Sequence, residues 1–109
     1  MGPAMATALK IPGYAHIQKT EGVRGGKACI EGTRIAVLDV VYATEQGHTP
    51  EQIQTLFSSR ELTLGEVYVA LGYYNDHRQE IDAERAAELA FAAGHEQRKA
   101  KYLKRITSR

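Results

Sequence analysis

Apolar and polar residues alternate in short N-terminal stretches, a pattern typical of half-buried β-strands. The alternating stretches predict strands at residues 14–18, 27–30 and 33–37. The last two form a hairpin around Glu31 and Gly32, since glycine adopts positive φ at little cost in a tight turn. Residues 20–26 hold three glycines and are expected to form a loop. Strands this short are marginally stable alone, so we expect them to pack on helices or to pair in a homodimer.

After residue 37 the apolar positions change to helical spacing, which predicts a first helix over residues 38–46. Capping boxes predict the starts of two further helices. In a capping box, two residues three positions apart form reciprocal hydrogen bonds, and the side chain of each accepts the backbone N–H of the other. These boxes begin at Thr49 and Thr63. A turn over residues 58–62 separates the two helices, and a short helix, a turn and a longer helix form the helix-turn-helix pattern.

The second and third helices are expected to bury one apolar face each. The second helix would bury Ile53, Leu56 and Phe57. The third, expected to be the longest, would bury Leu64, Val67, Tyr68, Leu71 and Tyr74. On this spacing Tyr73 lies off the buried stripe and is the tyrosine available for stacking on a nucleobase.

The C-terminal part of the chain differs in composition from the rest. Residues 82–93 are rich in alanine and predict a helix that Gly94 ends. Residues 95–109 mix a few apolar residues with many Lys and Arg, so we expect a basic segment that is mobile until it meets a partner.

At 109 residues the chain is long enough for one small domain. We divide it into a tag remnant and flexible N-terminus at residues 1–13, a domain at 14–81 and a helical, basic extension at 82–109. No apolar run approaches the roughly 18 residues of a membrane span. The single Cys29 excludes an internal disulfide, so a cytoplasmic location is the simplest expectation.

Charge is distributed unevenly although the net charge is only +1. Residues 1–37 carry five Lys or Arg and two Asp or Glu, residues 38–81 carry two and seven, and residues 82–109 carry seven and four. The acidic middle would repel a DNA backbone. The first turns of the third helix also offer Gly65, Glu66 and Tyr68 where a recognition helix presents basic or amide side chains.

DNA contacts are therefore assigned to the basic head, at Arg24, Lys27 and Arg34, with the basic tail as a second electrostatic contribution. For Lys27 and Arg34 the alternative interpretation is structural, with each cation paired to an acidic residue across a dimer. The nearby glycines are interpreted as turn formers, since no helix begins directly after them to bind a phosphate.

The sequence contains no pattern that indicates an enzyme. Cys29 is expected to be a buried, small apolar residue, because no histidine lies near it in the sequence. The four histidines lack the spacing of metal ligands, and no pair of acids has a catalytic setting. We therefore expect no catalytic residues, no metal and no cofactor.

The order GGKACIEGTRIAV followed by TPEQIQTLFSSRELTLGEVYVALGYYNDH resembles the small bacterial family called domain of unknown function 433. Its members are described as VapB-like antitoxins, and the resemblance covers residues 14–81. It implies a mainly α fold: a homeodomain-like helix-turn-helix preceded by a short β-hairpin. The chain departs from the family pattern by having alanine for proline at positions 28 and 36, and Ser58, Ser59 and Arg60 in place of a Tyr-Pro turn.

The resemblance also implies a partner, because such proteins are often encoded beside a PIN-like ribonuclease toxin. Such a toxin holds its metal with clustered carboxylates, which a cation from the tail would neutralise. The partner-binding candidates are Arg98, Lys99, Lys101, Tyr102, Lys104 and Arg105. The expected function is a dimeric, non-enzymatic antitoxin whose complex binds operator DNA. A stand-alone DNA-binding regulator and a self-assembling scaffold or adaptor remain as alternatives.

Overall fold

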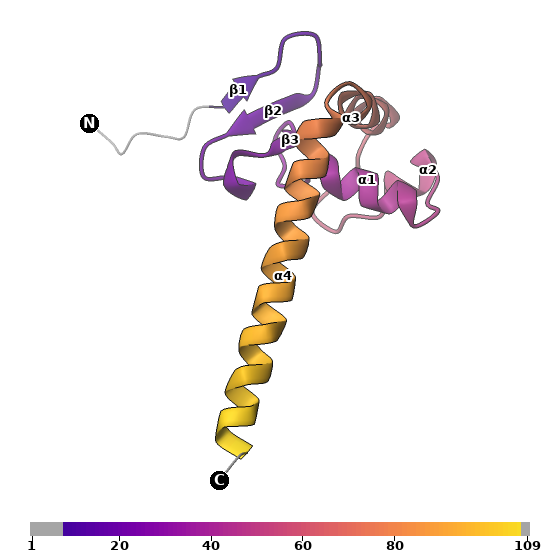
Figure 1. Cartoon of the computed structure of the whole chain (residues 1–109). Coiled ribbons are helices and arrows are strands. Elements are labelled where there is room, and N and C mark those ends of the chain that lie inside the picture. Colours follow the sequence, from indigo (N-terminus) through magenta and orange to yellow (C-terminus); the bar gives the residue numbers. More distant parts are fainter. Residues whose placement is uncertain (1–7, 108–109) are drawn as a thin grey trace, which may run out of the picture. The chain divides into compact units, whose positions relative to one another are not determined.

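The computed structural model describes residues 8–107, without the side chains of residue 100 and residues 102–107. The elements of this range are β1 (Ala8–Lys10), β2 (Ile17–Thr20), the 3-10 turn η1 (Arg24–Gly26), β3 (Ala28–Ile30), α1 (Val37–Glu45), α2 (Pro50–Ile53), α3 (Leu64–Asp76) and α4 (Arg78–Thr107) (Figure 1). The fold is mainly helical with a small N-terminal sheet, as predicted. The backbone divides into two compact units, residues 1–78 and residues 79–109.

In the described residues the strands form one antiparallel sheet in the order β1-β2-β3. Ile17 lies opposite Ile30, and Ala8 lies opposite Thr20. The strand predicted at 27–30 is confirmed as β3. The strand predicted at residues 14–18 begins later, at Ile17, and forms β2. The residues before Ile17 form turns, and His16 has a φ of 67°, which does not suit a strand. The expectation of a flexible N-terminus through residue 13 is wrong for β1, which pairs along β2.

The predicted strand at 33–37 does not form. The chain turns tightly after β3, with the Thr33 backbone N–H donating to the Ile30 carbonyl at 3.0 Å and Gly32 at a φ of 76°. A single bridge between Cys29 and Ala36 follows, and α1 begins at the next residue. The expected hairpin is therefore a turn that leads directly into a helix, since the apolar run from Ile35 continues as the buried face of α1.

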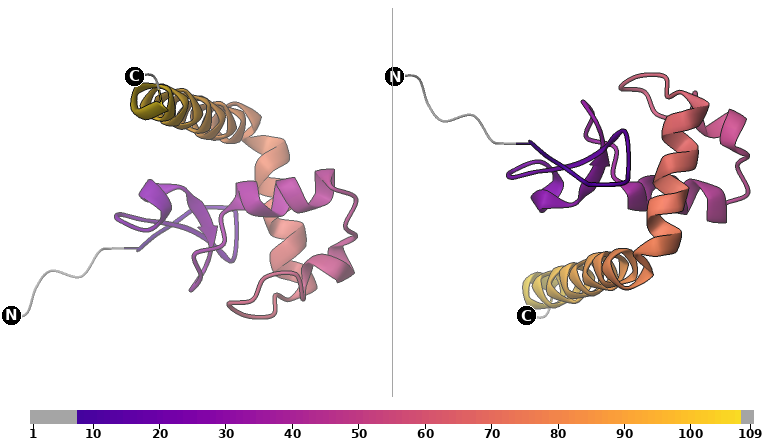
Figure 2. Two further views of the ribbon diagram at one scale, coloured as in Figure 1. Left: turned by 90° about the horizontal axis from the view of Figure 1, so that it is seen from below. Right: turned by 90° about the horizontal axis from the view of Figure 1, so that it is seen from above.

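Helices α1, α2 and α3 pack against one another in the first unit, and α1 also contacts β3 (Figure 2). The α1 helix is the centre of the core, and its buried residues are Val37, Leu38, Val40, Val41 and Ala43. Both predicted capping boxes are confirmed: the Gln52 N–H donates to Thr49 Oγ1 at 3.2 Å, and the Glu66 N–H donates to Thr63 Oγ1 at 3.1 Å. The α2 helix is a single turn, so Ile53 is buried but Leu56 is exposed.

The buried face of α3 differs from the predicted one. Tyr73 is 1% exposed, whereas Tyr68, which was expected in the core, is 54% exposed. The face that packs consists of Glu66, Val67, Ala70 and Tyr73. The buried stripe therefore runs through Glu66 and Tyr73, whereas Leu64 and Tyr68 are exposed. Tyr73 is thus a core residue and is unavailable for stacking on a base.

The longest helix in the described residues is α4, not α3. It continues through Gly94, where the sequence predicted an end, and through the part of the tail that we expected to be mobile. A glycine inside a helix costs only about 1 kcal/mol relative to alanine, and the alanine-rich residues before it favour helix strongly. No helix in residues 8–107 is both long enough and apolar enough to cross a membrane.

Candidate functional site

Arg24, the first predicted DNA contact, forms part of the fold. It has a φ of 50° in η1, and its Nη1 donates to Asp39 Oδ2 at 2.6 Å and to the Arg34 carbonyl oxygen at 2.8 Å. Asp39 Oδ2 also accepts the Ala36 backbone N–H at 2.9 Å, at the start of α1. Arg24 therefore has a structural role, because it fixes the η1 turn to the first turn of α1.

Arg34 is exposed and lies beside a groove, whereas Lys27 is half-buried after η1. The groove has a volume of about 530 Å³ and lies on the first unit. Its lining residues are Ala8, Gln18, Thr20, Val23, Gly32, Thr33, Arg34, Ser59 and Arg60. The structure thus brings Arg34 together with Arg60 and several hydrogen-bonding side chains, a combination suited to an anionic or polar ligand.

Arg60 belongs to a hydrogen-bond network with Glu66 and the Glu31 carbonyl oxygen. Its Nη2 donates to Glu66 Oε2 at 2.6 Å and to the Glu31 carbonyl oxygen at 3.2 Å. The Glu66 side chain is 8% exposed and also accepts the Thr63 N–H at 2.9 Å. The hydrogen bond from Arg60 is the main reason that the pKa of Glu66 is lowered to about 2. Burial opposes this shift, and the Thr63 backbone N–H adds to it. The capping box predicted the role of Glu66, but no local pattern indicated Arg60.

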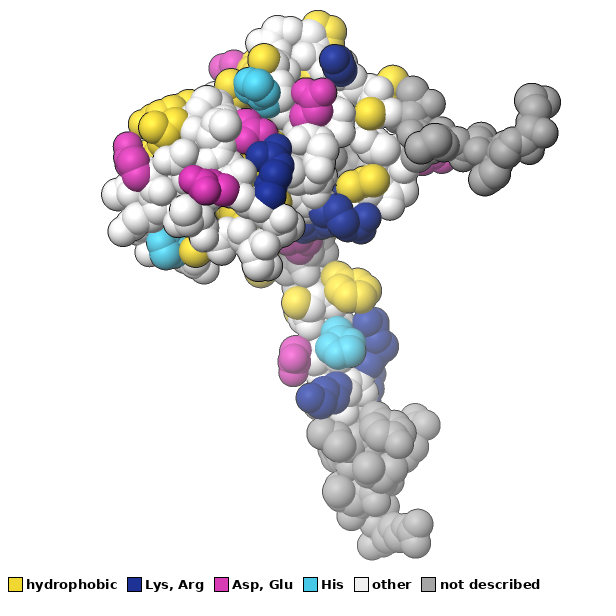
Figure 3. Space-filling model, turned by 180° about the vertical axis from the view of Figure 1, so that it is seen from behind, with side chains coloured by type: hydrophobic (Ala, Val, Ile, Leu, Met, Phe, Trp, Pro, Cys, Tyr) yellow, Lys and Arg dark blue, Asp and Glu magenta, His cyan; other side chains and the backbone are white. Residues whose placement is uncertain are grey.

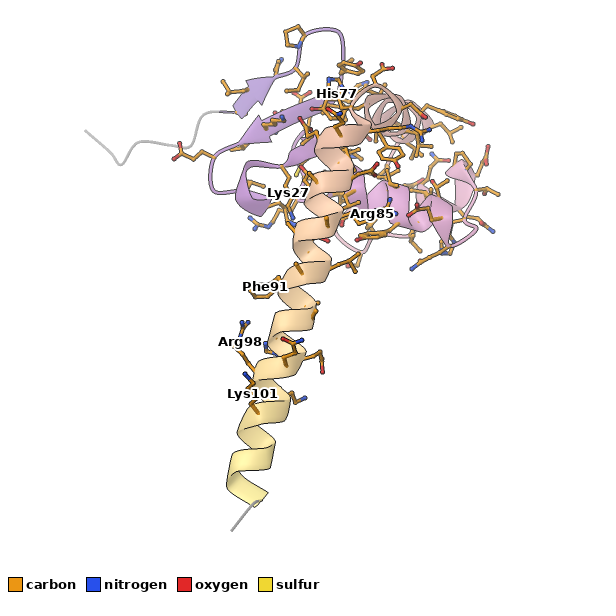
Figure 4. The ribbon with its side chains drawn as sticks, viewed as in Figure 1. Lys27, His77, Arg85, Phe91, Arg98 and Lys101 are labelled. Atoms are coloured by element: carbon orange, nitrogen blue, oxygen red, sulfur yellow. The ribbon has the colours of Figure 1, made fainter. Side chains whose placement is uncertain are left out.

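An aromatic cluster joins the loop before β2 to the end of α3. The Tyr73 ring stacks on His77 with centroids 4.1 Å apart, and Tyr14 meets both rings edge-on. The Tyr14 hydroxyl donates to Asp76 Oδ2 at 2.5 Å, and this bond raises the pKa of Tyr14. The cluster joins the loop before the β2 strand to α3, and Figure 4 labels His77, one of its three rings.

The described partner-binding candidates, Arg98, Lys99 and Lys101, are exposed on α4. Those at Tyr102, Lys104 and Arg105 lie in the α4 backbone, but their side chains are outside the described ones. Before these cations, α4 exposes Leu89 at 60% and Phe91 at 71%. Figure 3 shows hydrophobic and then basic side chains along this helix. The sequence did not indicate these exposed apolar residues, because its weak helical periodicity here does not separate a core face from an exposed one.

Cys29 and the possible metal ligands are the groups that could support catalysis. Cys29 is buried, as expected. Within the described residues, no group of three or more His, Cys, Asp or Glu is positioned to hold a metal ion.

Comparison with known proteins gives two findings. The family described as "Protein of unknown function (DUF433)" matches residues 17–74. A solved structure is also similar: the 2.00 Å crystal structure of a DUF433 member protein from Anabaena variabilis ATCC 29413. It is 35% identical, with a TM-score of 0.59, over 65% of this chain and 68% of that chain. No curated protein matches the sequence.

Proposed function

This chain belongs to the DUF433 family, and on that premise we propose that it is a non-enzymatic, antitoxin-like protein that binds and neutralises a PIN-like ribonuclease. In this proposal the protein acts in the cytoplasm as a dimer. The basic part of α4 binds the partner, and the first unit supplies a stable body and a secondary DNA contact.

The supporting observation is the exposed cationic surface of α4. Arg98, Lys99 and Lys101 are exposed on the helix, and Figure 4 labels Arg98 and Lys101 along it. A ribonuclease of this type presents clustered carboxylates, and charge-assisted hydrogen bonds to carboxylates are stronger than neutral ones. Complementary charge also accelerates association and selects the partner.

The first unit offers less cationic surface to an acidic partner. Arg24 is paired with Asp39, and Arg60 is paired with Glu66. Residues 38–81 carry seven Asp or Glu against two Lys or Arg, so their charge disfavours contact with carboxylates or phosphates. The electrostatic contribution to partner binding therefore falls on α4.

The test is inhibition of a PIN-like ribonuclease encoded beside this gene. The purified ribonuclease is titrated with the full chain and with the triple variant R98A/K99A/K101A, and RNA cleavage is measured. Desolvated charged pairs at an interface are worth several kcal/mol, so we expect the triple variant to inhibit roughly a hundredfold more weakly. Equal inhibition by both proteins would contradict the role of α4.

The matched control removes cations from the first unit. The variant K10A/R34A removes two cations from exposed positions, and it should inhibit within about twofold of the parent chain because surface charges remote from an interface change affinity little. If this control lost as much inhibition as the α4 variant, the effect would be one of net charge alone. Circular dichroism would verify that each variant is folded.

The groove beside Arg34 supports DNA binding as a second candidate function. Arg34 is exposed there, next to the hydrogen-bonding side chains of Gln18, Thr20 and Ser59. We expect R34A to weaken binding to operator DNA and to reduce the slope of log affinity against log salt by about 1 per chain, the value for one phosphate contact. Fluorescence anisotropy over a salt series measures both quantities, and an unchanged slope would remove Arg34 from the interface.

A further inference from the structure

One face of α3 is exposed, apolar and without charge. Tyr68 is 54% exposed, and Leu64, one turn before it, is 37% exposed. Gly72 lies one turn after Tyr68 on the same face, because helix positions four residues apart align. Residues 67–75 contain no Asp, Glu, Lys or Arg. A surface of this kind offers nothing to a phosphate backbone and is typical of one that another protein covers.

Gly72 lies inside α3, and the packing of the single chain does not require a glycine there. Glycine is less favourable in a helix interior than any residue except proline. The backbone at Gly72 is helical, and a Cβ added there would meet nothing within 4 Å. A larger side chain would therefore fit in the single chain. The missing side chain leaves a notch on the exposed face, which suits the close approach of a second molecule.

The face is complementary in shape to itself when two such helices run antiparallel. Leu64 precedes Tyr68 by four residues and Gly72 follows it by four, so each lies about 6 Å from Tyr68 along the helix axis. Gly65 and Leu71 are likewise each three residues from Tyr68. A twofold axis beside Tyr68 therefore brings each leucine to the level of a glycine of the second copy. The pairs are Leu64 with Gly72, and Leu71 with Gly65.

We propose that this face of α3 is an interface between two copies of the chain, in which α3 packs antiparallel against α3 of the second copy. The two Tyr68 rings lie side by side at the twofold axis. One face supplies both the projecting and the recessed positions, as an isologous contact requires. This inference goes beyond the proposed function, which names no surface for the dimer, and it holds whether or not α4 binds a ribonuclease.

Other arrangements and occupants fit this face less well. In a parallel pair, Leu64 would face Leu64 and Gly72 would face Gly72, so the helices could not pack closely at both levels. A charged protein or DNA would find no partner for an ion pair on residues 67–75. The chain itself supplies the matching order of large and small residues, which selects a second copy as the occupant.

Asn75 is the polar side chain at the C-terminal end of this face, seven residues after Tyr68. Its Nδ2 donates to the Leu71 carbonyl oxygen at 2.9 Å, and its Oδ1 accepts from Arg78 at 2.9 Å. Covering the face therefore leaves neither the amide nitrogen nor the amide oxygen of Asn75 without a hydrogen bond, so its burial carries no unsatisfied polar group.

The contact is small, so we expect a weak dimer. The face extends about 12 Å from Leu64 to Gly72, which places a single-helix contact at the low end of specific interfaces. The expected dissociation constant is roughly 10–100 μM. At about 1 μM the chain is then monomeric, so Tyr68 contributes to association and hardly to the stability of the single chain.

Sedimentation equilibrium on the full chain tests the proposal by filling the notch. We expect a concentration-dependent dimer, and G72Q should raise its dissociation constant at least tenfold, because glutamine occupies the space of the second copy's leucine. Circular dichroism of monomeric G72Q should show no loss of helix, since glutamine favours helix more than glycine. The matched control G94Q makes the same substitution inside α4, where a Cβ meets only the flexible end of Arg98. It should leave the dissociation constant within about twofold.

Cysteine variants test the direction of the helices. A mixture of L64C and G72C should form a disulfide-linked heterodimer under mild oxidation. Neither variant alone should do so, because its two new cysteines lie about 12 Å apart along the helix axis. A parallel pair would give the reverse pattern. The native Cys29 is buried and does not compete.

Three results would overturn the proposal. The first is a full chain that stays monomeric at about 500 μM, well above the expected dissociation constant. The second is a dimer whose dissociation constant G72Q leaves unchanged, and the third is a disulfide in L64C alone. Each readout reports self-association, so none of them depends on the outcome of the ribonuclease assay.

Discussion

Replacing Tyr73 with alanine is expected to lower the free energy of unfolding by about 3–4 kcal/mol, the cost typical of truncating a buried aromatic side chain. Tyr73 is 1% exposed, stacks on His77 and meets the edge of the Tyr14 ring. Its removal leaves a cavity where α3 is joined to the loop before β2. For a domain of this size the midpoint of thermal unfolding should fall by roughly 15 °C, which differential scanning calorimetry measures.

The matched control is Tyr68→Ala, which removes the same side chain from the same helix. Tyr68 is 54% exposed, so its loss should change stability by less than about 0.5 kcal/mol. The helical spacing of the sequence predicts the opposite, with Tyr68 in the core and Tyr73 off the buried stripe. Equal destabilisation by the two substitutions, or a larger effect of Tyr68→Ala, would mean that α3 packs through the originally predicted face.

The contrast between these tyrosines shows what the sequence could determine about the fold. The capping boxes at Thr49 and Thr63 located the starts of α2 and α3, because a cap is a local arrangement of side chain and backbone. The face that α3 buries depends on where α1 lies, which is a tertiary property. Tyrosine fits either the core or the surface, so its identity does not decide between them.

The strands show the same limit. The run after Gly32 is apolar and β-branched, which suits a strand as well as the buried helix that forms. Its conformation is decided by the turn at Thr33 and by Asp39, which accepts the Ala36 N–H at the start of α1. Asp39 also explains why Arg24 is structural: the pair joins residues 15 positions apart, and no local pattern reports such a contact.

For the candidate site, the sequence predicted which basic residues to consider, but not whether their side chains are exposed or held in ion pairs. The side chains of Arg34, Arg98, Lys99 and Lys101 are exposed, as a binding role requires. Arg24, in contrast, is held by Asp39 and the Arg34 carbonyl. The groove that contains Arg34 and Arg60 is formed by segments that lie far apart in the sequence, from Ala8 to Arg60. Because the tertiary arrangement of the sheet and the loop before α3 brings its lining residues together, no local sequence pattern predicts the groove.

The pair of Arg60 and Glu66 makes the stability of the first unit depend on pH. The pKa of Glu66 is about 2 in the folded protein, below its ordinary value of 4.5. A carboxyl group with a lowered pKa stabilises the fold fully above its unfolded-state pKa, and this contribution is lost as the pH falls through the folded-state value. Glu66 should therefore contribute its full stabilisation at neutral pH and lose it between about pH 4.5 and pH 2.

Replacing Glu66 with glutamine should cost about 2 kcal/mol at pH 7, because the buried site then lacks the charge that faces Arg60. Glutamine keeps an oxygen that can accept the Thr63 N–H, so the variant tests the charge more than the cap. The stability difference between parent and E66Q, measured by urea unfolding, should shrink as the pH falls from 4.5 toward 2. The control E61Q alters an exposed neighbour and should change stability by less than about 0.5 kcal/mol at any pH. A difference for E66Q that stays constant over this range would show that Glu66 stabilises the fold through packing and hydrogen bonding alone, and that its ionisation contributes nothing.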